Sequence, residues 1–272
     1  MSIQDEIAIG NERLWERMVK EGCGYTIPWL ELDRVLLRQY ATGQLETVPD
    51  SLIEIYPPSI LVDVEGLEVL CLASGGGQQS AAFGLLGARV TVLDLTEGQL
   101  DGDRKAAEHY GYEVTALKGD MRDLSCFHDG AFDLVYQGTS MGYIPDVRQV
   151  YAEVARVLRT GGVYRVDFSQ PGVFSTQWNG EAYCITRPYA ENIHRREDGA
   201  IEFRHYLSDI FNGLLDMGFS IERVHEEPHY QRKAPQAQPG SWTHQQIYVS
   251  GGFAIVAKKG HVSTVPRDES RG

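Results

Sequence analysis

The stretch VLCLASGGGQQSAAFGLLGARVTVLDL, residues 69–95, constrains the fold of this chain more than any other segment. Its order predicts a short buried strand, a glycine loop, an alanine-rich helix and a second apolar strand. Glycine adopts positive φ and lets a ligand approach the backbone, so Gly75–Gly77 indicate either a tight turn or a binding loop. In open α/β sheets, ligands bind beyond the carboxyl ends of the strands, where this loop would lie.

Strands and helices continue to alternate after this unit, which predicts a parallel sheet with helices on both faces. The late segments 219–227 and 251–260 have no helix between them, so they predict an antiparallel pair at the sheet edge. The remaining expected strands are 68–73, 89–95, 112–120, 131–137 and 163–168, and the expected helices are 78–87, 97–110, 147–160 and 206–218.

The regions around this alternating core have a different character. Apolar residues at helical spacing predict two early helices, within 11–22 and 29–43. A stretch rich in Pro, Gly, Trp and Tyr interrupts the alternation before the last helix and predicts a lid-like insertion. The expected organisation is a helical cap at 1–60, a main domain at 61–260 with the insertion near 170–205, and a disordered tail at 261–272.

Asp94 ends the second expected strand, and its position favours a binding loop over a simple tight turn at Gly75–Gly77. A carboxylate at that position can accept hydrogen bonds from both vicinal hydroxyls of a ribose. Asp94 is otherwise an ordinary N-cap, but Thr96 can fill that role and leave the carboxylate available. Gly75 and Asp94 together predict a ligand that contains adenosine, which leaves a nicotinamide-dependent oxidoreductase and a methyltransferase open.

Several segments resemble the motifs of class I S-adenosylmethionine-dependent methyltransferases. VLCLASGGG resembles the first motif, V-L-D-x-G-x-G-x-G, except that Cys71 replaces its acid and Ala73 its first glycine. In the family, that acid helps to order the loop and the methionine amine. Further resemblances follow in the family's order from about residue 66 to 258: ALKGDMRDL, FDLVYQGTSMGYIPD, VYAEVARVLRTGGVYRVDF and LLDMGFSIERVHEEP. A dehydrogenase would not reproduce this order across 116–168.

The resemblance implies a doubly wound Rossmann-like fold and is nearest to the small-molecule, ubiquinone-biosynthesis-like group of the family. It implies S-adenosylmethionine as cofactor, S-adenosylhomocysteine as product and a small-molecule methyl acceptor as partner. Asp94 would hold the ribose, and Asp120 and Met121 the adenine. The full set of cofactor-binding residues that it implies is Ala73, Ser74, Gly75, Gly77, Gln78, Asp94, Leu95, Asp120, Met121 and Gln137.

Catalytic residues carry no motif in this sequence. His205 is the candidate general base and Tyr143 the candidate residue beside the transferring methyl, with packing as the alternative role of each. Tyr25 in the cap is placed to reach the methionine carboxylate. Three aromatic residues in the insertion are expected to give the lid an apolar wall: Trp178, Tyr183 and Tyr189.

Charge and composition exclude other classes of function. The net charge of −13 opposes binding to a nucleic-acid backbone, and the N- or D-P-P-Y/F motif of amino methylation is absent after the fourth strand. No apolar run is long enough for a membrane span, and the scattered cysteines indicate reduced thiols and a cytoplasmic protein. HEEPH at 225–229 matches a zinc-protease string, but Pro228 opposes the helix that the metal chemistry needs. A protein that binds the cofactor without catalysis remains an alternative function, because Cys71 and Ala73 depart from the first motif of the family.

Overall fold

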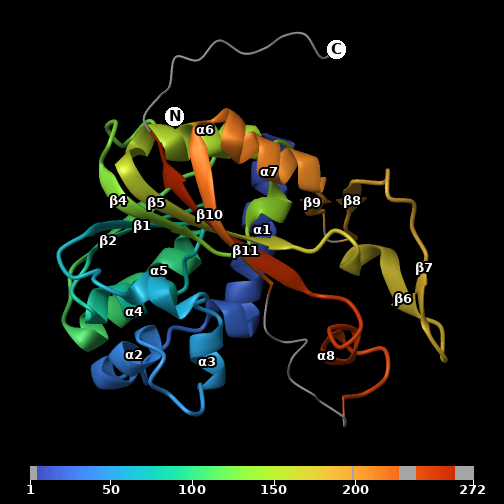
Figure 1. The fold of residues 1–272 in the computed structure, drawn as a ribbon, viewed down its shortest axis with the longest axis horizontal. Helices are drawn as coiled ribbons and strands as arrows, with labels where there is room; N and C mark the ends of the chain where they lie inside the picture. Colours follow the sequence, from blue (N-terminus) through green and yellow to red (C-terminus); the bar gives the residue numbers. More distant parts are fainter. Residues whose placement is uncertain (1–4, 198, 227–236, 261–272) are drawn as a thin grey trace.

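A seven-stranded sheet forms the centre of the computed structural model, which describes residues 5–197, 199–226 and 237–260 (Figure 1). Its strand order is β10-β11-β5-β4-β1-β2-β3. Strands β1 to β5 pair in parallel, and β11 is antiparallel to both β5 and β10. The strands are β1 (Glu68–Leu72), β2 (Arg89–Asp94), β3 (Val114–Lys118), β4 (Phe132–Gln137), β5 (Leu158–Ser169), β10 (Phe219–Glu226) and β11 (Gly252–Lys259).

Strand β1 shows why the central strands of this sheet have apolar residues at successive positions. Leu70 and Leu72 belong to the hydrophobic cluster on one face, whereas Val69 and Cys71 belong to the cluster on the other. Because both faces are covered, both sets of side chains must be apolar. The predicted doubly wound, mostly parallel sheet with a late antiparallel strand is confirmed.

Helices cover the sheet on both faces, as Figure 1 shows. Helices α6 (Val147–Val157) and α7 (Leu207–Asp216) pack against one face, and α4 (Gln79–Leu85) and α5 (Glu97–Tyr110) lie on the other. The helix expected at 147–160 ends earlier, because Leu158 already pairs with Phe132 of β4 as the first residue of β5. Strand β5 is therefore longer than the expected 163–168.

The N-terminal residues form α1 (Glu6–Glu21), α2 (Arg34–Ala41) and α3 (Asp50–Ile53), with short 3-10 turns at Gly24–Thr26 and Pro58–Leu61. Asp5 caps α1 by accepting from the amide of Ala8 at 2.8 Å, and Gly22 ends it in the left-handed conformation. The helix expected at 29–43 begins only at Arg34, because Asp33 caps it through the amide of Leu36 at 2.8 Å.

The segment expected as a lid-like insertion contains two hairpins rather than loops alone. They are β6 (Thr176–Trp178) with β7 (Tyr183–Ile185), and β8 (Ile193–Arg195) with β9 (Ile201–Phe203). Short 3-10 turns at Met141–Tyr143 and Val173–Ser175 and the helix α8 (Trp242–Gln245) complete the elements. The tail expected at 261–272 lies outside the described residues. Within the described ranges, no helix has the length and apolar character that crossing a membrane requires.

Candidate functional site

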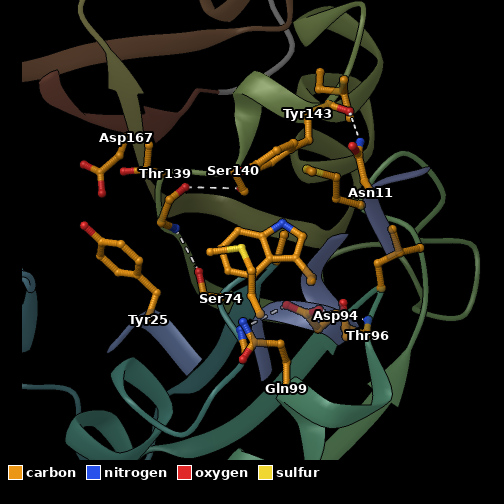
Figure 2. A pocket seen from close by; sticks show the side chains of 18 of the residues that line it. Asn11, Tyr25, Ser74, Asp94, Thr96, Gln99, Thr139, Ser140, Tyr143 and Asp167 are labelled. Atoms are coloured by element: carbon orange, nitrogen blue, oxygen red, sulfur yellow. Dashed lines mark hydrogen bonds between the residues drawn. The ribbon is translucent and has the colours of Figure 1, made fainter. Parts of the chain in front are cut away.

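A cavity of about 750 Å³ opens at the carboxyl edge of the sheet. Residues that follow β1, β2, β3 and β4, and the end of β5, all contribute to its lining. Helix α1, Tyr25, Glu54, Gln99 of α5 and α8 contribute further walls. Figure 2 shows side chains from these separate elements around one space, with Asp94 on one side and Asp167 on the other.

The loop after β1 packs too closely to carry side chains at its glycines. The amide of Gly75 donates to Asp94 Oδ2 at 3.1 Å, and a Cβ on Gly75 would lie 2.7 Å from the Cβ of Gln99. Gly77 has a φ of 73°. Ala73, at the position where the family has its first glycine, has a φ of 45° and so adopts the left-handed conformation that glycine favours.

Asp103 of α5 organises this loop and was missed by the sequence analysis. It is fully buried, and its carboxylate accepts from the amides of Gly76 at 3.1 Å and Gly77 at 3.0 Å. The hydroxyl of Ser80 also donates to it. Burial raises the pKa of Asp103 to about 7, against these hydrogen bonds, which lower it. Asp103 thus supplies the carboxyl group at the loop that Cys71 does not.

Asp94 is held in place by backbone amides on both sides. Its carboxylate accepts from Gly75 and, at 3.0 Å, from the amide of Thr96. Thr96 occupies the N-cap position of α5, as expected, although its side chain makes no capping hydrogen bond. Burial raises the pKa of Asp94 to about 6. Two amides leave acceptor positions on the carboxylate for ligand hydroxyls.

Asp120 is fixed by an arginine that the sequence analysis did not single out. Arg122 donates from its amide, Nε and Nη2 to the two Asp120 oxygens, at 2.9, 3.0 and 2.7 Å. The same guanidinium binds Asp5 at the start of α1 at 2.8 Å. Asp120 and Arg122 are both buried, so this chain of ion pairs ties the cap to the site. Asp120 lines the cavity with part of its acceptor capacity already used.

Two buried amide oxygens in the lining lack hydrogen-bond partners. Asn11 Oδ1 and Gln99 Oε1 are unsatisfied, although the side chains are 4% and 5% exposed. The Asn11 amide nitrogen donates to the carbonyl of Tyr143 at 3.0 Å, which fixes its orientation. Buried acceptors without donors are unfavourable, so these two fit a ligand that carries N–H or O–H groups. An adenosine with a methionine amine has both kinds of group.

The cavity gathers most of the predicted cofactor residues but not all of them. Gly77 and Gln137 lie outside the lining. Gly77 turns its amide to Asp103, and Gln137 is fully buried behind the wall, where it donates to Ser140 Oγ at 2.9 Å. Both therefore support the site from behind. The lining includes the other predicted residues: Ala73, Ser74, Gly75, Gln78, Asp94, Leu95, Asp120 and Met121.

The two predicted catalytic candidates occupy different environments. Tyr143 lines the cavity and packs edge-on against Trp15, with ring centroids 5.8 Å apart. His205 does not line it, because its Nε2 lies 2.8 Å from the carbonyl oxygen of Met141 and its ring packs on Phe168. Burial lowers the pKa of His205. This geometry opposes a role for His205 as general base.

None of the three predicted lid aromatics lines the cavity, and two of them pack against α8. Trp178 and Tyr183 pack against His244 of α8, with ring centroids 5.2 and 5.5 Å away, and the Tyr183 hydroxyl lies 2.7 Å from His244 Nδ1. Tyr189 packs against Tyr206. The predicted aromatic wall of the cavity is therefore wrong, because none of these three side chains is among the lining residues. The β6–β7 hairpin thus packs on α8, and the residues of α8 and its flank that line the cavity are Trp242, Thr243 and Gln246.

Asp167 near the end of β5 is a further lining residue that the sequence analysis missed. It is 8% exposed, and Arg165 donates to its Oδ2 at 2.5 Å. Arg165 is itself 1% exposed beneath the site, where its guanidinium lies over the ring of Tyr136 at 4.3 Å. Burial raises the pKa of Asp167, against the opposing charge of Arg165. An acidic residue near the carboxyl end of a predicted strand was the signal for it.

The zinc-protease string gains no support from the part that the structure describes. His225 lies in β10 and packs edge-on against Tyr56 at 5.2 Å, while residues 227–229 lie outside the described residues. Among the residues that are described, no group of three or more His, Cys, Asp or Glu is placed to hold a metal.

Comparison with known proteins agrees with this geometry. The family described as Methyltransferase domain matches residues 70–166. The uncharacterized methyltransferase YbaJ of Bacillus subtilis is 32% identical over 231 residues, covering 80% of this chain and 89% of that protein. The chain belongs to the S-adenosylmethionine-dependent methyltransferase family.

The methyltransferase is also similar to a ubiquinone biosynthesis O-methyltransferase of Xanthomonas oryzae, with 30% identity over 52% of this chain and 59% of the relative. A solved S-adenosylmethionine-dependent methyltransferase from Mesorhizobium loti shares the fold, with a TM-score of 0.62, 22% identity and coverage of 74% of this chain and 94% of that one.

Proposed function

We propose that this methyltransferase transfers the methyl group of S-adenosylmethionine to a small molecule by direct displacement in the cavity at the carboxyl edge of the sheet. One observation carries the proposal: residues from five neighbouring strands and from the cap line a single space of about 750 Å³. This size lies within the range of small-molecule sites. It is consistent with a cofactor and a small acceptor side by side.

The residues that would hold the cofactor follow from the positions of charge and unsatisfied acceptors. Asp94 would hold the ribose hydroxyls, and Asn11 and Gln99 offer their unpaired oxygens to donors of the same molecule. Tyr25 borders the cavity from the cap and would lie near the methionine carboxylate. Met121 would flank the adenine.

S-Adenosylmethionine supplies a methyl group that its sulfonium already makes electrophilic. The chain then has to orient the acceptor and exclude water, for which α1 and α8 border the cavity. Because the donor supplies the reactivity and the protein mainly positions the acceptor, the site needs no conspicuous catalytic motif. A general base is required only for an acceptor whose proton must leave.

Three observations support a small-molecule acceptor or a cytoplasmic location. The net charge of −13 disfavours nucleic acid as the acceptor. The four cysteines, Cys23, Cys71, Cys126 and Cys184, are all free thiols, which is typical of a reducing compartment. The similarity to a ubiquinone biosynthesis O-methyltransferase is consistent with a small acceptor.

The two alternative functions, an oxidoreductase and a non-catalytic binding module, have less support. A nicotinamide-dependent oxidoreductase is not favoured by the comparisons. A binding module without catalysis was suggested by Cys71 and Ala73, but Asp103 orders the loop and Ala73 adopts the required left-handed conformation. Both departures from the family pattern therefore leave the loop intact.

Calorimetric titration with S-adenosylhomocysteine, with NAD in parallel, tests the proposal. We expect the former alone to bind, and Asp94→Ala to weaken it about 100-fold through loss of hydrogen bonds to a charged acceptor. The variant must keep its far-UV circular dichroism spectrum for the comparison to hold. Binding of NAD alone, or unchanged affinity in Asp94→Ala, would contradict the assignment of the site.

A further inference from the structure

Asn11 is a polar residue in the otherwise apolar face that α1 turns to the cavity. The α1 residues that line the cavity follow helical spacing, and they are Ile7, Ala8, Asn11, Trp15 and Met18. The Asn11 side chain is 4% exposed. Asparagine is a weaker helix former than alanine or methionine, because its side chain competes with the backbone for hydrogen bonds. Packing and helix formation alone would therefore favour an apolar side chain at this position.

The side-chain amide of Asn11 has one satisfied arm and one unsatisfied arm. Its Nδ2 donates to the carbonyl oxygen of Tyr143 at 3.0 Å. Because a carbonyl oxygen can only accept, this bond fixes which arm of the amide carries Oδ1. Oδ1 is buried and has no hydrogen-bond partner among the described residues. A buried acceptor without a donor is unfavourable, so Oδ1 fits an N–H or O–H group of a ligand.

Two ion pairs place this part of α1 beside the loop that follows β3. Asp5, the cap of α1, binds Arg122 at 2.8 Å. Glu12 binds Lys118 Nζ at 2.6 Å. Asn11 lies between these two ion pairs in the sequence of the helix and is the neighbour of Glu12. The cavity face of α1 at Asn11 is therefore held against the end of β3 and its following loop.

The residue proposed to hold the ribose lies on the same side of the cavity. Asp94 of β2 is the register partner of Lys118 in β3. Figure 2 shows Asn11 on the side of Asp94 and away from Tyr25 and Asp167. In the strand order β1-β2-β3, the glycine loop lies on one side of Asp94 and the loop after β3 on the other. A nucleoside with its methionyl part at the glycine loop and its ribose at Asp94 thus brings its base toward β3 and α1.

Asp120 has less hydrogen-bonding capacity for this base than its position suggests. Its Oδ1 accepts from the amide and Nε of Arg122, and its Oδ2 accepts from Nη2 of the same residue. These bonds use both acceptor positions of Oδ1 and one of the two on Oδ2. Asn11 Oδ1 keeps both of its acceptor positions toward the described residues. The exocyclic amino group of adenine carries two N–H donors and is the group of the base that such an acceptor fits.

We propose that Asn11 selects adenine in this methyltransferase, with its Oδ1 accepting a hydrogen bond from the amino group at C6 of the purine. This proposal rests on the proposed function, since it assumes that S-adenosylmethionine binds with its ribose at Asp94. A purine without that amino group leaves Oδ1 buried and unpaired, so the site discriminates against it. The N-terminal cap thus takes part in the choice of cofactor as well as in covering the cavity.

Two ligands that differ by one amino group test the proposal. They are S-adenosylhomocysteine and its 6-deamino analogue, in which hydrogen replaces the amino group of the purine. In calorimetric titration, we expect the wild type to bind S-adenosylhomocysteine at least ~10-fold more tightly than the analogue. Asn11→Leu and Asn11→Ala should each reduce this preference by ~5-fold or more. Equal binding of the two ligands by the wild type, or an unchanged preference in the variants, would overturn the proposal.

The ratio of the two affinities separates recognition of the base from a structural role of Asn11. Loss of the bond to the Tyr143 carbonyl can loosen α1, but this change weakens both ligands together and leaves their ratio unchanged. Arg13→Ala, at an exposed position of α1 outside the lining, is the matched control and should keep the wild-type ratio. If Asn11→Leu does not fold, Asn11→Ala supplies the measurement. Failure of the wild type to bind either ligand would instead reject the proposed function.

Discussion

Ala73 shows how a residue can depart from a family pattern while keeping its backbone geometry. The family has glycine at this position, and the φ of 45° at Ala73 explains why. An L-residue in the left-handed region costs about 1–2 kcal/mol, because its Cβ crowds the following carbonyl oxygen. Here the surrounding contacts of the loop, among them the Ala73 amide bonded to the Leu93 carbonyl at 2.8 Å, hold the conformation.

Ala73→Gly should therefore raise the free energy of unfolding. Relief of the left-handed conformation exceeds the entropy that glycine adds to the unfolded chain, so we expect a gain of about 0.5–1 kcal/mol. Urea denaturation of both proteins measures it. Ala152→Gly, at an exposed position within α6, serves as the matched control and should lose about 1 kcal/mol. Equal losses in the two variants would contradict this account of Ala73.

Helix α1 illustrates how an element outside the sheet takes part in the site. Its residues Asn11, Trp15 and Met18 line the cavity. Asp5 fixes the start of the helix twice, as cap of α1 and as partner of Arg122. Arg122 in turn binds Asp120, so the position of α1 depends on the loop that follows β3.

Asp5→Ala should weaken both the fold and the binding of S-adenosylhomocysteine. Loss of the cap lowers the free energy of unfolding by about 1 kcal/mol. Loss of the tie to Arg122 lets α1 move away from the cavity, and we expect a several-fold weaker affinity. Asp33→Ala removes the corresponding cap of α2, which does not line the cavity, and should lower stability alone. Calorimetry and thermal melting of both variants distinguish the two effects.

At the scale of the whole molecule, local sequence patterns predicted the sheet and most of the named residues that line the cavity at its carboxyl edge. Continuous apolar strands, the glycine loop and Asp94 are readable because each signal lies within one short segment. Asp103 and Arg122 escaped prediction because their partners lie on other elements, Asp103 on the glycine loop and Arg122 at the start of α1. The packing of Trp178 and Tyr183 against α8 likewise depends on contacts between segments far apart in the sequence.

Burial of two acids beside the glycine loop should give the whole fold a distinctive response to pH. The pKa of Asp94 is raised to about 6 and that of Asp103 to about 7, in each case chiefly by burial. The unfolded chain releases both protons near pH 4, whereas the folded chain keeps them to higher pH. Between these limits the folded state binds more protons, so these two groups lower the free energy of unfolding as pH rises from about 4 to 7.

Asp103→Asn isolates this effect from the other titrating groups, because asparagine resembles the protonated acid and does not ionise. The asparagine loses one acceptor for the amides of Gly76 and Gly77, so the variant should be less stable than the wild type at pH 5. The deficit should shrink by about 1–3 kcal/mol by pH 8, because only the wild type must then carry a buried charge. Urea denaturation across this range measures the difference, and a deficit that stays constant or grows with pH would show that the loop amides stabilise the ionised acid more than burial disfavours it.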